Sequence, residues 1–118
     1  GKIDRLKTDL IKMLEGIKSE GKTIAGYGAA AKANTFMSYI GIDSKYLKYI
    51  ADLSKYKQGL FFSGNHLPIV HPEQLIKDQP DYVLILAWNF ADEIIKQQEE
   101  YRSKGGRFIV PIPELKIV

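Results

Sequence analysis

The stretch IAGYGAAAKANTF, residues 24–36, decides the fold. Two glycines, Gly26 and Gly28, follow a short apolar run, and an alanine-rich segment with one lysine comes directly after them. In a strand-to-helix turn the first glycine permits the tight bend, and the second lets backbone amides approach a pyrophosphate. The stretch therefore predicts a strand, a glycine-rich turn and a helix in immediate succession.

The rest of the chain continues this alternation. Apolar residues recur at spacings of three and four from Ile3 to Ile17, which predicts an amphipathic helix ending near Gly21. Residues 82–87 are an unbroken apolar run, as expected for a central strand that is buried on both faces. Further strands are predicted at residues 23–25, 46–51, 68–70 and 107–110, and further helices at residues 29–40, 72–79 and 89–104.

Strands alternating with helices predict one α/β domain. Right-handed helical crossovers between parallel strands give a three-layer, Rossmann-like open sheet of about five strands with helices on both faces. We expect residues 1–21 to be a leading helix or linker, and residues 22–118 to form the α/β core. Because the chain begins with Gly1 directly inside a helical pattern, we also expect it to be a piece of a longer protein.

Composition narrows the class of ligand. The 118 residues include 17 basic and 14 acidic ones and no cysteine, and the net charge of +3 is too weak to indicate nucleic acid. Because the chain has no cysteine, disulfides and thiolate metal ligands are excluded. His66 and His71 are expected to point to opposite faces of a short strand and so not to share a metal. The apolar stretches are too short to span a membrane and no secretory signal is visible, so we expect a cytoplasmic protein without membrane partners.

Candidate binding residues follow the predicted strands at their carboxyl ends, the edge at which open parallel sheets bind ligands. Lys32 lies one turn into the first core helix, where its charge adds to the partial positive charge of the helix N-terminus. Asp52 follows the second strand, at the position from which an acidic residue accepts hydrogen bonds from a ribose. Trp88 follows the central strand and can stack on a base or sugar, whereas Asn89 is expected to cap the next helix.

A long polar loop, residues 53–67, completes this edge. Loops of this length are usually functional or mobile, and Lys57 and Gly59 lie on it where a cation can help to hold a phosphate. A purely structural interpretation of the edge stays open. In that interpretation the small residues of the turn only let the helix pack closely on the strand, Asp52 caps a turn, and Trp88 covers the sheet edge.

Four segments of the chain resemble a known family. GYGAAAKANTFMSYIGI, ADLSKYKQGLFFSGNHLPIV, PDYVLILAWNFADEII and GGRFIVPIPE occur in the order found in the C-terminal domain of S-adenosylmethionine-dependent C-methyltransferases, and the resemblance covers residues 17–114. That family includes enzymes that methylate carbon on nucleotide-linked deoxysugars. The resemblance implies a second Rossmann-like unit that helps to form the cleft for the nucleotide-sugar.

The resemblance also implies where the chemistry takes place. Full-length relatives have an N-terminal zinc-binding segment and a central domain that binds S-adenosylmethionine and supplies the catalytic base. We therefore expect no cofactor, catalytic residue or metal in this piece, and we expect the upstream methyltransferase domain as its partner in the same polypeptide. The residues expected to contact the substrate are Gly26, Tyr27, Gly28, Ala29, Ala30, Lys32, Asn34, Asp52, Lys57, Gly59, Trp88 and Asn89.

Two departures from the family lie in the long loop. Leu53 and the following Ser54-Lys55-Tyr56 replace an expected arginine or asparagine, and Ser63-Gly64 replaces a proline–glycine pair. Both positions bear on which sugar or base is selected. Two other classes also fit the residues: a nicotinamide-dependent oxidoreductase domain, which the glycine-rich turn and the aspartate allow, and a structural module that binds nothing.

Overall fold

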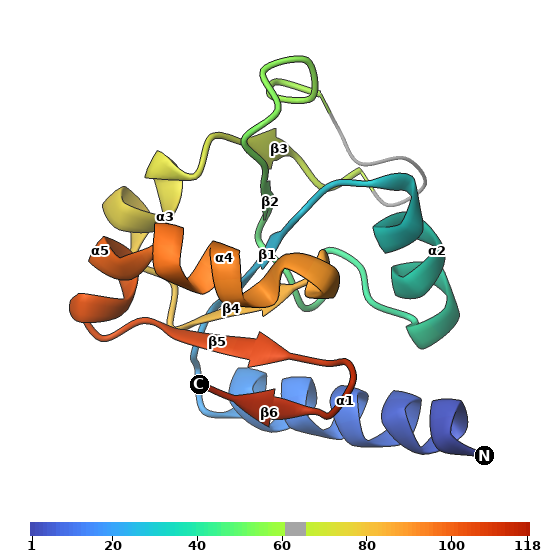
Figure 1. Ribbon diagram of the computed structural model, residues 1–118. Helices are drawn as coiled ribbons and strands as arrows, with labels where there is room; N and C mark the ends of the chain where they lie inside the picture. The colour runs from blue at the N-terminus through green and yellow to red at the C-terminus, as the bar shows by residue number, and fades with distance from the viewer. Residues whose placement is uncertain (61–65) are drawn as a thin grey trace.

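The computed structural model describes residues 1–60 and 66–118 and shows a six-stranded sheet with strand order β3-β2-β1-β4-β5-β6 (Figure 1). All neighbours in the sheet are parallel except β5 and β6, which are antiparallel. The mixed α/β fold predicted from the sequence is confirmed. In chain order the elements are α1 (Lys2–Ser19), β1 (Ile24–Tyr27), α2 (Ala31–Ile40), β2 (Ile50–Ala51), β3 (Ile69–Val70), α3 (Glu73–Asp78), β4 (Tyr82–Ile85), the 3-10 turn η1 (Trp88–Phe90), α4 (Ala91–Gln97), α5 (Glu99–Ser103), β5 (Arg107–Val110) and β6 (Lys116–Ile117).

Helices cover both faces of the sheet. The period-2 alternation of the strands sends Ile24 and Leu84 toward α1 and α2, and Ala25 and Val83 toward α3, α4 and α5. Each face thus has its own apolar core, with buried residues of α1 and α2 in one and of the three later helices in the other. The unbroken apolar sequence of β1 and β4 follows from this burial on both sides.

Three details differ from the sequence prediction. The second strand is shorter than expected, because the backbone N–H groups of Tyr46 and Leu47 both donate to the carbonyl of Asp43 and so form a turn. The helix predicted at residues 89–104 is interrupted at Gln98 and divides into α4 and α5. A sixth strand, β6, was not predicted; it returns along β5 after a turn with two prolines.

The expectation that Asn89 caps the helix after β4 is wrong. Asn89 lies inside η1, and α4 begins after Phe90 without a side-chain cap. One other sequence assignment, the substituted pair Ser63-Gly64, falls outside the residues that the structure describes.

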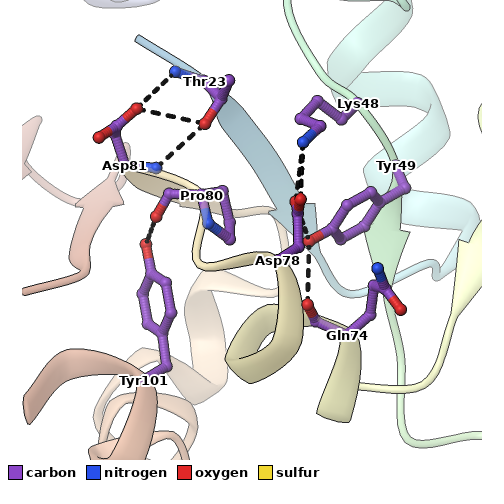
Figure 2. A network of polar contacts seen from close by, with 8 residues as sticks. All are labelled: Thr23, Lys48, Tyr49, Gln74, Asp78, Pro80, Asp81 and Tyr101. Atoms are coloured by element: carbon purple, nitrogen blue, oxygen red, sulfur yellow. Dashed lines mark hydrogen bonds and ion pairs between the residues drawn. The ribbon is translucent and has the colours of Figure 1, made fainter. Parts of the chain in front are cut away.

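A polar network ties together the amino ends of the strands (Figure 2). The Asp81 carboxylate, just before β4, accepts hydrogen bonds from the backbone N–H (2.8 Å) and hydroxyl (3.2 Å) of Thr23, just before β1. At the start of β2, Asp78 accepts from Lys48 and from the Tyr49 hydroxyl, each at 2.9 Å. Burial, and then the bond to Asp78, raises the pKa of Tyr49.

Tyr101 of α5 belongs to the same edge, because its buried hydroxyl donates to the carbonyl of Pro80 at 2.7 Å (Figure 2). Nearly all polar groups of the network are therefore engaged in holding strands and helices together. This edge is a structural clamp, and the opposite, carboxyl edge carries the candidate site.

Candidate functional site

The carboxyl edge brings together segments that are far apart in the sequence. The Gly28–Ala30 turn follows β1, which itself contains Gly26; the segment from Asp52 to Gly59 follows β2, and Trp88 follows β4. Because β2, β1 and β4 are adjacent parallel strands, they end at the same edge of the sheet, and the segments that follow them lie together there. The structure thus brings together at this edge most of the residues that we expected to contact a substrate.

The two glycine amides complete the sheet and are not available to a ligand. The N–H of Gly26 donates to the carbonyl of Tyr49, and the N–H of Gly28 to the carbonyl of Ala51, each at 2.9 Å. We expected these amides to face a pyrophosphate, and the hydrogen bonds correct that expectation. The turn instead needs glycine for its shape.

Gly28 has the stricter requirement. Its φ of +102° is rarely adopted by other residues, and a Cβ built there would lie 2.7 Å from the Cβ of Ala87. A Cβ at Gly26 would meet Leu47 and Leu86 side-chain atoms at 3.2 Å. Both glycines therefore allow the turn to lie close to the end of β4.

Asp52 holds this turn from the side of β2. Its carboxylate accepts a 2.7 Å hydrogen bond from the N–H of Ala29 through one oxygen, and a 2.7 Å bond from the N–H of Ser54 through the other. An anion at this place also interacts favourably with the positive end of the α2 dipole. The carboxylate that we expected to bind a ribose is thus engaged within the chain.

Lys57 holds the same turn from the loop. Its Nζ donates to the carbonyl of Ala29 at 3.0 Å, so Ala29 is bound through its N–H by Asp52 and through its C=O by Lys57. Gln58 adds a 2.9 Å bond from its side-chain amide to the Asp52 carbonyl. Gly59 ends this segment with φ +85° and donates its N–H to Ile69.

Lys32 is an exposed cation at this edge. Its Nζ lies 4.7 Å from the centroid of the Trp88 ring and 3.4 Å from Oδ1 of Asn89. A cation over an indole face is held by the ring quadrupole. Phe36, one helical turn after Lys32, packs against Trp88, and the centroids of the two rings are 4.9 Å apart. The sequence analysis missed Phe36, although its i+4 spacing from Lys32 signals a shared helix face.

The start of α2 keeps free backbone donors beside this cation. Among the described residues, the N–H groups of Ala30 and Lys32 have no acceptor, as is usual for the first turn of a helix. Asn34, in the same turn, is half-buried and its own N–H donates to the carbonyl of Ala30. Free amides and a positive side chain together form a place that favours an anion.

Tyr27 does not join this group. Its side chain packs in the core beneath α3, α4 and α5, on the opposite face of the sheet from α2. Among the described residues nothing forms a hydrogen bond with its buried hydroxyl. Burial raises the pKa of Tyr27, and the negative charge of Asp52 raises it further.

Two further features are absent from the part of the chain that the structure describes. No three His, Asp or Glu residues among residues 1–60 and 66–118 are grouped so as to hold a metal ion. Over the same ranges no helix has the length and apolar character needed to cross a membrane.

The sheet, its glycine-rich turn and the sequence around them define the class of protein. The chain belongs to the family described as the C-methyltransferase C-terminal domain, whose sequence profile matches residues 1–113. It is similar to the C-methyltransferase NovU of Streptomyces niveus, with 39% identity over 115 residues, which is 98% of this chain and 27% of NovU. The chain thus spans about a quarter of the length of this relative. The family resemblance seen in the sequence is confirmed.

Proposed function

We propose that this chain is the substrate-binding module of an S-adenosylmethionine-dependent C-methyltransferase, and that it contacts the diphosphate of a nucleotide-sugar. Methyl transfer then takes place in another domain of the parent protein, which holds S-adenosylmethionine and zinc. Family membership and the similarity to NovU support the methyltransferase part of the proposal. The parent protein acts in the cytoplasm.

The observation that carries the substrate part is the position of Lys32. Its ammonium group stands over Trp88 and beside Asn89, and Lys32 itself belongs to the first turn of α2, where backbone amides lack acceptors among the described residues. Charge-assisted hydrogen bonds from an ammonium group and from helix-terminal amides suit phosphate oxygens. The indole and the Asn89 amide keep the lysine at this edge until a diphosphate recruits it.

The remaining residues shape the proposed phosphate-binding site at the start of α2. Gly26 and Gly28 bring the turn close to β4, and Asp52 and Lys57 hold Ala29, so that the start of α2 is fixed before a ligand arrives. A fixed site loses less conformational freedom on binding than a mobile one. Asn34 and Gly59 border the same edge and extend the contact toward the sugar or base.

One observation favours a second candidate, a structural module without a ligand. Both glycine amides and the Ala29 amide are already engaged, so part of the glycine-rich turn is explained by packing alone. A nicotinamide-binding domain finds less support, because the Asp52 carboxylate already binds two backbone amides and the family is that of C-methyltransferases.

The experiment uses the tryptophan at the site. Trp88 is the one tryptophan among the 118 residues, so a ligand that draws Lys32 away from its ring changes the intrinsic tryptophan fluorescence. Separate titrations use a nucleotide-sugar, NAD and S-adenosylmethionine. A saturable change with the nucleotide-sugar alone supports the proposal. Saturation with NAD or S-adenosylmethionine contradicts it, and no response to any of the three supports the structural module.

A further inference from the structure

The apolar stripe of α1 continues beyond the core that it covers. Leu10 and Leu14 are completely buried and Ile17 nearly so, but Ile3, two turns earlier on the same stripe, is 64% exposed. Figure 1 shows the first turns of α1 extending past the β5–β6 turn, on the side where α2 lies. Where an apolar helix face is exposed over part of its length, the exposed part is expected to pack against another apolar surface.

The exposed part of the stripe lines an apolar groove between α1 and α2, with a volume of about 490 Å³. Tyr39 of α2, 48% exposed, forms part of its wall. The side chains that give the groove its apolar character are Ile3, Leu6, Phe36, Tyr39, Trp88 and Ile112.

A second depression, of about 320 Å³, borders the same helical turns. Pro111, Pro113 and Leu115 of the β5–β6 turn contribute to it, and it shares Ile3, Leu6 and Ile112 with the first groove. These three shared side chains therefore form a ridge between the two depressions. A complementary partner has to present an apolar surface that fits over this ridge.

Basic residues outnumber acidic ones around this surface. Lys2 and Arg5 line the second depression together with Asp9, Lys32 lines the first, and Lys7 lies with its Nζ 5.4 Å from the Tyr39 ring centroid. Asp4 is engaged by the Tyr39 hydroxyl at 3.0 Å. A second copy of this chain, brought together by a two-fold axis through the groove, would set these cations against their own equivalents. The charge pattern favours an acidic partner instead.

We propose that the ridge and its two depressions are the docking surface for the rest of the methyltransferase polypeptide, which presents an apolar segment flanked by acidic residues. The family is described as a C-terminal domain, and most of the length of NovU lies outside the region similar to this chain. The inference rests on the proposed place of this chain in a longer methyltransferase. It does not depend on the nucleotide-sugar contact.

Hydroxyl-radical footprinting tests the docking surface on the intact methyltransferase that contains this chain, without substrate. The oxidation of Tyr39 is compared with that of Tyr56, which is 94% exposed on the loop after β2 and serves as an internal reference. Docking is expected to lower the Tyr39:Tyr56 ratio several-fold relative to the 118-residue chain alone. An unchanged ratio overturns the proposal.

Two further measurements separate the remaining outcomes. Protection of Tyr39 in the 118-residue chain that grows with its concentration would show self-association and would also overturn the proposal. In the intact protein, Ile3→Asp should restore the oxidation of Tyr39, whereas the control Ile117→Asp, on β6 away from the groove, should not. Because no nucleotide-sugar is present, failure here leaves the Trp88 titration unaffected, and failure of that titration leaves the footprint unaffected.

Discussion

The carboxylate of Asp52 accepts a 2.7 Å hydrogen bond from the backbone N–H of Ala29, twenty-three positions earlier in the chain. This bond joins the end of β2 to the turn after β1, at the place where α/β folds of this kind commonly receive a ligand anion. The chain therefore provides an anion of its own at this turn. The backbone donors that lack an acceptor among the described residues lie instead at the start of α2.

Replacing Asp52 tests this bond. Asp52→Ala should lower the free energy of unfolding by about 1–3 kcal/mol more than Asp43→Ala, the range for a lost hydrogen bond to a charged group. Asp43 is the matched control because it also accepts from the amide two residues later, that of Lys45, but from no amide distant in the chain. Urea denaturation measures the difference. Equal losses for both variants would show that the Ala29 contact is not stabilising.

Asp52 and Lys57 are expected to act together, because they hold the two polar groups of one residue, Ala29. In a double-mutant cycle of Asp52→Ala and Lys57→Met, we expect a coupling of about 0.5–3 kcal/mol, typical of residues in one network. The free energies of unfolding of the four proteins give the coupling. Additive effects would mean that the loop and the aspartate stabilise the turn independently.

Gly28 should tolerate alanine poorly. Gly28→Ala combines a strained φ of +102° with a Cβ 2.7 Å from that of Ala87, whereas Gly105→Ala has the same strain, at φ +104°, in open space. We expect Gly105→Ala to cost about 1–3 kcal/mol, and Gly28→Ala to cost clearly more. Thermal unfolding of both variants separates backbone strain from steric overlap, and similar losses would contradict the role given to Ala87.

Alkaline pH should weaken the packing of α1. The Tyr46 hydroxyl donates to Glu15 of α1 at 2.6 Å, and this bond, followed by burial, raises the pKa of Tyr46 from 10.0 to about 12. The folded state keeps the hydroxyl protonated to a higher pH than the unfolded state does. The contribution of this bond to stability is therefore complete below pH 10 and is lost as the pH rises to about 12. The free energy of unfolding should fall more steeply over this interval in the parent protein than in Tyr46→Phe. Parallel pH profiles would exclude the contribution.

Lys32 should contribute to nucleotide-sugar binding through its charge. Lys32→Met keeps most of the side chain over Trp88 and removes the ammonium group, so we expect affinity to fall by about 10- to 100-fold, the effect of one charge-assisted hydrogen bond. Lys12→Met on α1 is the control, since Lys12 is equally exposed and far along the chain from the site. Calorimetry gives both affinities. An unchanged affinity in Lys32→Met would remove this lysine from the site.

The fold could be predicted from the sequence because the residues that decide it act locally. The two glycines at the end of β1 and the apolar run of β4 indicate their elements without reference to distant contacts. The sixth strand could not be predicted, since a two-residue strand at the edge of the sheet forms only because β5 is there to pair with it. Likewise the interruption at Gln98 depends on how α4 and α5 both pack on the sheet.

For the candidate site, the sequence predicted which segments meet but not how they bond. The carboxyl ends of adjacent parallel strands converge, so the neighbourhood of Lys32, Asp52 and Trp88 followed from topology. The partner of Asp52 depends on the direction of single amides, and the partner of Asn89 depends on the side chain of Lys32. Such contacts are set by three-dimensional packing and leave no pattern in the chain.

Lys32 and Trp88 line the groove beside α1 and also stand at the carboxyl edge of the sheet. If both proposals hold, an event that moves the indole or the ammonium group at one of these surfaces would change the other. Thermodynamic linkage would then require reciprocity: the factor by which a docked domain alters the affinity for a ligand equals the factor by which that ligand alters the affinity for the domain. A lysine held over an indole ring would thereby make assembly and ligand recognition one coupled equilibrium.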